Sequence, residues 1–274
     1  TVEIASAWLA CGLDPNKTLF YRQSDVPETF ELLTILMAFT AKGLMNRAHA
    51  YKAIVQNNLE NGKDPDDGVN MGLYTYPILM AADILLFDTD FVPVGTDQFQ
   101  HIEMAQDIAQ SFNYVYKTQA LKIPQPIAQE ETKTVVGLDG RKMSKSYNNT
   151  IPMFCPEKEL KKLIMSIVTN SQTVEEPKEP DTSNIFALYK NFASPEQIEN
   201  MHTRYLKGGL GWGQAKLELF EVINAELTPL RKRYNYWINN QDDIWNALKA
   251  GSEKARILAA EKITKLRKII GIGK

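Results

Sequence analysis

The sequence predicts an α/β fold, built on a parallel sheet, in the first part of the chain and an all-helical fold in the last part. Two patterns carry this prediction. Residues 89–112 follow the order strand, glycine turn, helix, which is typical of parallel α/β proteins. After about residue 151, apolar residues recur at helical spacing. With 274 residues, the chain is long enough for one or two domains with a large core.

The first residues have the pattern of an amphipathic helix that is already under way. The chain starts at Thr1 without a methionine, and its apolar residues fall on one helical face at Ile4, Ala5, Trp8 and Leu9. We therefore expect the natural N-terminus to lie upstream of Thr1.

The next elements are a strand, a helix and a loop. The apolar stretch 19–21 follows a turn sequence and predicts a short buried strand. Pro27 then opens a helix that continues to Thr40. Residues 57–72 are polar and contain Asp-Pro-Asp-Asp-Gly, which indicates a loop or an insertion. We expect residues 48–72 to be a connecting segment within the first domain.

The central part of the chain alternates helix and strand. Residues 76–87 are apolar at helical spacing, and Thr89–Val94 predicts a strand whose Pro93 favours an end or irregular position. A helix is expected from Asp97 to Phe112 after the glycine turn. Val135 and Val136 predict a further strand that leads into a lysine-rich loop.

The last part of the chain is expected to be helical throughout. Residues 194–197, Ser-Pro-Glu-Gln, combine a capping serine, a proline at the first helical position and a glutamine at the third. Two long helical patterns follow, through residues 217–223 and 257–270. The predicted domains are residues 1–170, with the sheet, and residues 171–274, with helices alone.

Composition and charge narrow the function classes. No apolar run reaches the roughly 18 residues of a membrane span, and Cys11 and Cys155 form no disulfide framework or metal-ligand spacing. Two idle thiols favour a reducing, cytoplasmic compartment. Residues 204–274 contain fourteen Lys/Arg against seven Asp/Glu, a balance of +7 in a chain of net charge −2. This asymmetry indicates either a polyanionic partner or an ordinary solvated helical surface.

The segment Lys142-Met143-Ser144-Lys145-Ser146 is the strongest functional signal. It follows an Asp139-Gly140 pair, which demands a tight bend and leaves the next residues exposed. Lysine is a compact charge on a flexible stem, suited to gripping the outer phosphates of a nucleotide. The alternative is a solvated turn rich in lysine and serine.

Tyr76, Met80 and Asp83 are spaced i, i+4, i+7 and therefore share one face of the predicted helix. Asp83 is surrounded by apolar residues in the sequence, so its carboxylate needs a donor. It is either a structural acceptor or the one acceptor in a pocket with aromatic and thioether walls. Such a pocket suits a flat ligand with a single N–H, such as indole.

The segment Val92-Pro93-Val94-Gly95-Thr96-Asp97-Gln98-Phe99-Gln100-His101 forms the second candidate site. Gly95 directly after a strand permits a close approach of ligand to backbone. Asp97 could accept hydrogen bonds from ribose hydroxyls or simply cap the next helix. Gln98 could reach an amino or carboxyl group of a substrate, whereas His101 is more typical of a structural residue.

Together, these motifs resemble those of class I aminoacyl-tRNA synthetases, specifically the bacterial tryptophanyl-tRNA synthetase family. Tyr-Pro-x-Leu-Met-Ala-Ala-Asp, Val-Pro-Val-Gly-x-Asp-Gln-x-Gln-His and Lys-Met-Ser-Lys-Ser occur in the family's order and approximate spacing. The resemblance runs from about Leu9 to the C-terminus. It implies a Rossmann-type catalytic domain at 1–170 and a helical anticodon-binding domain at 171–274.

The resemblance also implies substrates, partners and residue roles. Tryptophan would be activated with ATP and passed to tRNA(Trp). The enzyme would be a cytoplasmic homodimer with no membrane association. Mg²⁺ would accompany ATP, and the protein would have no metal site of its own. Lys142 and Lys145 would be catalytic. The tryptophan-binding residues would be Asp83, Tyr76, Met80 and Gln98. The ATP-binding residues would be Gly95, Thr96, Asp97, Val135, Lys142, Met143, Ser144, Lys145 and Ser146.

Two departures keep alternatives open. The family's N-terminal His-x-Gly-His-like motif is absent, because His49, His101 and His202 lie in other contexts. A synthetase-like binding or regulatory protein without ligation activity is therefore one alternative. Lys52 lacks the second nearby lysine of many relatives, so its contact with ATP is an open hypothesis. A tyrosyl-specific relative is the other alternative. The equivalent helix of that family resembles Tyr-x-x-x-Gln-x-x-Asp, whereas this chain has Met80 at the Gln position, and a thioether suits a ring face better than a hydroxyl.

Overall fold

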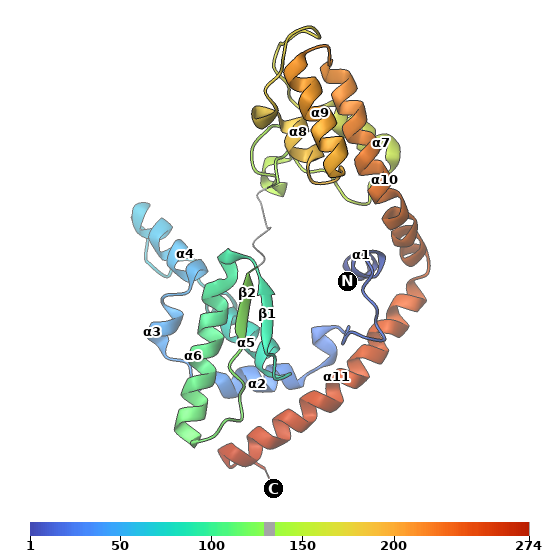
Figure 1. Cartoon of the computed structure of the whole chain (residues 1–274). Coiled ribbons are helices and arrows are strands. Elements are labelled where there is room, and N and C mark those ends of the chain that lie inside the picture. The colour runs from blue at the N-terminus through green and yellow to red at the C-terminus, as the bar shows by residue number, and fades with distance from the viewer. Residues whose placement is uncertain (129–134, 274) are drawn as a thin grey trace. The chain divides into compact units, whose positions relative to one another are not determined.

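The computed structural model describes residues 1–128 and 135–273. The chain forms two compact units. The sheet unit comprises Pro15–Thr132 and Asn246–Lys274, and the helical unit comprises Thr1–Asp14 and Lys133–Trp245. Figure 1 shows the elements of both units along the chain.

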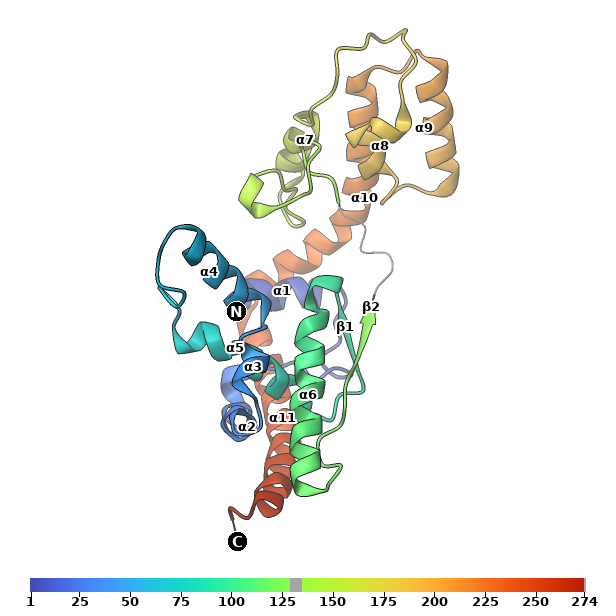
Figure 2. The same cartoon turned by 90° about the vertical axis from the view of Figure 1, so that its left-hand side faces the viewer.

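The sheet unit contains a parallel β-α-β crossover, as the sequence predicts. Strands β1 (Phe91–Val94) and β2 (Gln125–Ala128) are parallel, with Phe91 opposite Gln125 and Val94 opposite Ala128. A short 3₁₀ helix, η2 (Thr96–Gln98), leads into α6 (Phe99–Tyr116), which connects the strands and packs against β2. Figure 2 shows α6 beside the two strands. Parallel strands need such a crossover, and it leaves their carboxyl ends at one edge of the sheet.

Helices form the rest of the sheet unit. They are α2 (Glu28–Met37), α3 (Lys42–Met45), α4 (His49–Glu60), α5 (Met71–Leu85) and most of α11 (Gln241–Ile270). Helix α5 packs against α2 and α6. The core contains fully buried residues of α2, α5, α6 and α11, among them Leu32, Leu36, Ala81, Ala82, Leu85, Ile108, Phe112, Ala255, Ala259 and Leu266.

The helical unit confirms the prediction for the last part of the chain. It contains α1 (Val2–Ala10), η3 (Lys145–Tyr147), α7 (Glu157–Met165), η4 (Pro180–Thr182), α8 (Asn184–Tyr189), α9 (Pro195–Lys207) and α10 (Trp212–Asn239). Helix α10 packs against α1, α7 and α8. Helix α9 begins with the predicted capping box, in which Ser194 and Gln197 satisfy each other's backbone N–H groups.

Three local predictions are wrong. Residues 19–21 form no strand in the described structure; Leu19 and Tyr21 instead pack against the helical core. Val135 and Val136 do not form a strand either, because Val136 makes only an isolated bridge with Lys142. Residues 57–60 belong to α4, so the loop before α5 is shorter than predicted. A strand needs a continuous ladder of backbone pairs, and these positions have at most one isolated bridge in the described structure.

The compact units do not follow the predicted boundary at residue 170. Residues 1–14 belong with the helical unit because α1 packs on α10, and residues 246–274 belong with the sheet unit because α11 enters its core. The division into 1–170 and 171–274 stays a prediction about function. Within residues 1–128 and 135–273, no helix is both long enough and apolar enough to cross a membrane.

Candidate functional site

Helix α5 carries Tyr76, Met80 and Asp83, and all three are half-buried. Asn70 caps the helix by accepting a hydrogen bond from the Leu73 backbone N–H at 2.9 Å. Pro77, Ile78, Ala81, Ala82 and Leu85 of the same helix are buried. The apolar face therefore fixes α5 in the core, and the three predicted residues retain accessible surface.

The Asp83 carboxylate has a side-chain donor that the sequence analysis missed. Gln23 Nε2 donates to both carboxylate oxygens of Asp83, at 2.9 and 2.7 Å. Burial raises the pKa of Asp83, and the hydrogen bond from Gln23 opposes this effect. Burial and the neighbouring Asp83 charge raise the pKa of Tyr21 to about 12, so its phenol is neutral near pH 7. A carboxylate with two oxygens still has acceptor positions beyond those that Gln23 uses.

Tyr76 is paired with His101 of α6. The phenol oxygen lies 3.2 Å from His101 Nε2, and the ring centroids are 5.5 Å apart. His101 is only 6% exposed, and burial, with a smaller contribution from His49, lowers the pKa of its imidazole. The ring is therefore neutral near pH 7 and suited to orienting Tyr76, in line with the structural interpretation of His101.

Gly95, Thr96, Asp97 and Gln98 lie at the carboxyl end of β1, where parallel α/β folds place ligands. A Cβ added at Gly95 would lie 2.8 Å from Asp97 Oδ1, so a larger residue there would require the Asp97 side chain to move. Gln98 Nε2 donates to Asp97 Oδ2 at 3.1 Å. Asp97 is exposed and does not cap α6, because Gln98 occupies the cap position and makes no side-chain cap bond. The simple capping alternative for Asp97 is therefore wrong.

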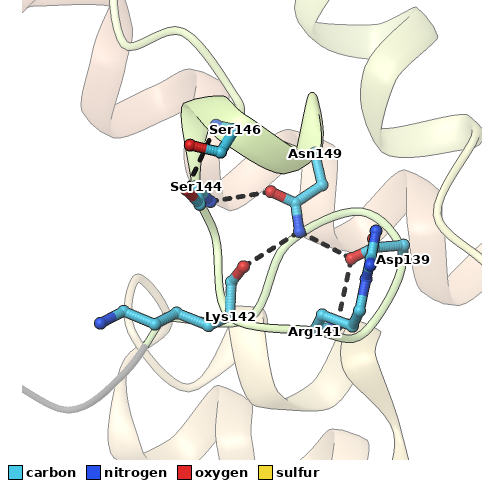
Figure 3. A network of polar contacts seen from close by, with 6 residues as sticks. All are labelled: Asp139, Arg141, Lys142, Ser144, Ser146 and Asn149. Carbon is cyan, nitrogen blue, oxygen red and sulfur yellow. Dashed lines mark hydrogen bonds and ion pairs between the residues drawn. The ribbon is translucent and has the colours of Figure 1, made fainter. Parts of the chain in front are cut away.

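The lysine loop is organised by a buried side chain, Asn149, which is only 2% exposed (Figure 3). Its Nδ2 donates to Asp139 Oδ1 at 2.7 Å and to the Lys142 carbonyl at 3.1 Å. Its Oδ1 accepts from the Ser144 backbone N–H at 2.8 Å. A side chain at Gly137 would meet Asn149 Nδ2 at 2.2 Å, so the packing of Asn149 requires glycine there.

The predicted turn begins this loop. Gly140 has φ +83°, a conformation that favours glycine. Asp139 accepts hydrogen bonds from Asn149 and from the backbone and side chain of Arg141, and these bonds lower the pKa of Asp139 to about 2. Val135, predicted to lie near a nucleotide base, is 45% exposed, and its carbonyl accepts from the Met143 N–H at 2.8 Å.

The loop presents its lysines outward. Lys142 and Lys145 are exposed, and in Figure 3 the Lys142 side chain extends away from the polar network. Met143 is half-buried, Ser146 is exposed, and the Ser144 hydroxyl accepts from the Ser146 N–H at 3.2 Å to begin η3. The loop therefore presents two exposed lysine side chains on a backbone that Asn149 holds, an arrangement that suits the binding of a polyphosphate.

The predicted site residues fall into two groups. Tyr76, Met80, Asp83 and residues 95–98 belong to the sheet unit, whereas Val135 and residues 142–146 belong to the helical unit. Within the sheet unit, Tyr76 of α5 contacts His101, which follows residues 95–98 on α6, and within the helical unit Val135 and residues 142–144 are joined by hydrogen bonds. Gln23 and Asn149 are the polar residues that the sequence analysis missed. Asn149 lies just after the lysine motif, whereas Gln23 lies in no motif, and their contacts cross 10 and 60 residues of sequence respectively.

Comparison with known proteins decides the family. The model of tRNA synthetases class I (W and Y) matches residues 1–228. The chain belongs to this family. It is similar to the tryptophan–tRNA ligase of Neisseria meningitidis, with 52% identity over 273 residues that cover 99% of the chain and 81% of that protein. The tryptophan–tRNA ligase of Pseudomonas aeruginosa is 51% identical over the same share of the chain.

The structural comparison gives the same family. A tryptophanyl-tRNA synthetase from Campylobacter jejuni, complexed with ADP and tryptophan, has a TM-score of 0.88 and 44% identity, and the match covers 99% of this synthetase chain and 82% of the other. The predicted fold class, a Rossmann-type sheet with a helical C-terminal region, is thereby confirmed. The chain spans 61% of the length of the Pseudomonas relative.

Proposed function

We propose that this synthetase activates L-tryptophan with ATP and transfers it to tRNA(Trp), the reaction of a tryptophan–tRNA ligase. The α5 face carries the proposal: Met80 and the half-buried Asp83 offer a thioether wall and a carboxylate acceptor. Indole has one N–H donor and a flat apolar ring, so it matches both groups. The names of the relatives, and the tryptophan and ADP bound to the Campylobacter protein, support the same substrates.

Each predicted residue has a chemical task in this proposal. Asp83 accepts from the indole N–H, Met80 contacts the ring, and Tyr76, oriented by His101, lines the pocket. Gln98 contacts the amino-acid end of tryptophan. Gly95, Thr96 and Asp97 contact adenosine, and Val135 packs near adenine.

The reaction depends on positioning and charge stabilisation. A carboxylate oxygen of tryptophan attacks the α-phosphorus of ATP, and the bond from that phosphorus to the pyrophosphate oxygen breaks. Lys142 and Lys145, on the loop of residues 142–146, stabilise the charge that develops on pyrophosphate. The terminal ribose hydroxyl of tRNA then attacks the aminoacyl carbonyl and releases AMP.

Mg²⁺ would enter with ATP. Among residues 1–128 and 135–273, no group of three or more His, Cys, Asp or Glu side chains could hold a metal ion. The proposed cation would be bound mainly by phosphates and water, since Mg²⁺ retains several waters in such sites. Its chemistry would be to neutralise part of the phosphate charge.

The proposal extends to partners and location. Residues 171–274 would recognise the tRNA anticodon, and residues 1–170 would carry out catalysis. The active form would be a homodimer. Cys11 and Cys155 are free thiols, which fits a reducing, cytoplasmic compartment.

Amino-acid-dependent ATP–pyrophosphate exchange by the intact natural protein tests this proposal. We expect exchange with tryptophan and none above background with tyrosine, because Met80 offers a phenol hydroxyl no hydrogen bond of useful strength. Exchange with tyrosine alone would contradict the substrate. Tryptophan binding without exchange would favour the regulatory alternative.

A further inference from the structure

Gln23 has an unusual contact with Asp83. One amide nitrogen donates to both carboxylate oxygens, at 2.9 and 2.7 Å, although the two residues are 60 positions apart. A single donor placed between two oxygens resists rotation of the carboxylate about its final bond. The remaining acceptor positions of Asp83 are therefore held in fixed directions.

The same contact opposes the cost of burying Asp83. Burial alone favours the neutral acid, whereas a donor to the carboxylate favours the ionised form. An ionised carboxylate is the stronger acceptor for an N–H group. Gln23 therefore favours both the orientation and the charge state that an N–H ligand needs.

Helix α11 holds the turn that carries Gln23. This turn is the 3₁₀ helix η1 (Gln23–Asp25). Ser252 is 5% exposed, and its single hydroxyl proton has two acceptors within reach, Asp25 Oδ2 at 3.0 Å and the Leu248 carbonyl oxygen at 2.8 Å. A Cβ added at Gly251 would lie 1.9 Å from the Phe20 carbonyl oxygen, so the helix touches the backbone just before the turn. Gln23 thus lies between two points that α11 fixes, Phe20 and Asp25.

We propose that Gln23 is a positioning residue for substrate selection, acting on tryptophan through Asp83, and that Gly251 and Ser252 of α11 hold its turn in place. The inference rests on the proposed function, since it names how the same pocket recognises indole. It predicts that replacing Gln23 lowers the affinity for ligands with an indole N–H and has little effect on the affinity for ligands without one.

The test compares tryptophan with its benzothiophene analogue, in which sulfur replaces the indole N–H, by calorimetry on the intact protein. Gln23→Ala should weaken tryptophan binding about ten-fold, the size of one hydrogen bond to a charged group, and the analogue less than about two-fold. Gln23→Glu keeps the shape, removes the donor and adds a second carboxylate, so it should weaken tryptophan at least as much. In exchange kinetics, both variants should raise KM for tryptophan more than they lower kcat.

Variants of α11 test whether this helix holds the turn of Gln23 in place. Gly251→Ala has a better intrinsic helix propensity but places its Cβ against the Phe20 carbonyl, and Ser252→Ala removes the contact with Asp25. Each should reduce the preference for tryptophan over the analogue by about three-fold or more. Ser24→Ala, on the same turn, and Glu253→Ala, on the same helix, are exposed controls that should leave this preference unchanged.

Two outcomes would overturn the inference while the proposed function stands. These are wild-type affinity in Gln23→Glu, which would mean that Gln23 only fills space, and equal losses for both ligands in Gln23→Ala. A wild type that binds neither ligand would overturn the proposed function and the inference with it.

Discussion

Replacing Asn149 by alanine should slow pyrophosphate exchange without weakening tryptophan binding. Asn149 is buried at the base of the lysine loop and joins Asp139, Lys142 and Ser144 through its side chain. The alanine variant leaves the Lys142 carbonyl and the Ser144 N–H without this partner. The backbone that presents Lys142 and Lys145 then has fewer contacts that favour its ordered form.

The structure gives a magnitude for this loss. The two bonds to neutral backbone groups contribute roughly 1 kcal/mol each, about 2 kcal/mol together, or about 30-fold in the ratio of ordered to disordered loop. The hydrogen bond from Asn149 to Asp139 adds to this loss when the carboxylate is ionised, at pH values above the ordinary aspartate pKa of about 4. Because the folded pKa of Asp139 is about 2, that contribution is lost as the pH falls from about 4 toward 2.

The assay is tryptophan-dependent ATP–pyrophosphate exchange at saturating tryptophan, together with calorimetric tryptophan binding. We expect Asn149→Ala to lower the exchange rate by about ten- to 30-fold while the Kd for tryptophan changes by less than about two-fold. Asn148→Gly is the matched control, because Asn148 is exposed and has φ 51°, which glycine adopts freely. An Asn149→Ala enzyme that exchanges as fast as wild type would refute the reasoning.

Four further variants and one pH experiment address the other groups. Lys145→Ala should slow exchange by about two orders of magnitude if the lysine supplies about 3 kcal/mol in the transition state; an unchanged rate in the same assay would remove it from catalysis. Asp83→Ala should weaken tryptophan by about 1–3 kcal/mol and the benzothiophene analogue less, as measured by calorimetry, and equal losses would leave Asp83 structural. In wild type, tryptophan affinity should fall as the pH is lowered toward the raised pKa of Asp83, while analogue affinity stays level. Lys232→Ala should lower the salt slope of tRNA binding by about one unit, whereas Arg233→Ala should lower the melting temperature instead, because Arg233 Nε donates to the Ala10 carbonyl at 2.6 Å.

Local sequence patterns predicted the elements that position the site. The i, i+4, i+7 spacing placed Tyr76, Met80 and Asp83 on one helix, and the strand–glycine–helix order predicted β1 and α6. The capping box at Ser194 was predicted in full. These features succeed because they depend on contacts within a few residues.

Strands were predicted less well because a strand is defined by its partner. Strand β2 was missed, since Gln125–Ala128 is four residues long and contains Pro126, which argues against a strand. Residues 19–21 have strand-like composition but lie against helices. Pairing partners come from the whole fold, so composition alone cannot supply them.

The same reasoning explains the missed polar residues. The sequence indicated that Asp83 needs a donor, but nothing near it in the chain identifies Gln23. The lysine motif was evident, yet the buried residue that shapes it, Asn149, lies just beyond the motif. Sequence motifs identified the groups that were predicted to meet ligands, and the fold was needed to find the groups that hold them.

The charge asymmetry of the chain has a partly internal explanation. The acidic surplus before residue 204 and the basic surplus after it suggested a polyanionic partner. In the sheet unit, however, basic residues of α11 pair with acidic residues of the earlier chain: Arg256 with Glu28, Arg267 with Glu31, and the buried Lys262 with Asp88. Part of the +7 charge balance of residues 204–274 therefore comes from basic residues of α11 that form ion pairs within the sheet unit. A tRNA-binding surface must be sought among exposed lysines such as Lys232, and the sequence balance alone overstates its charge.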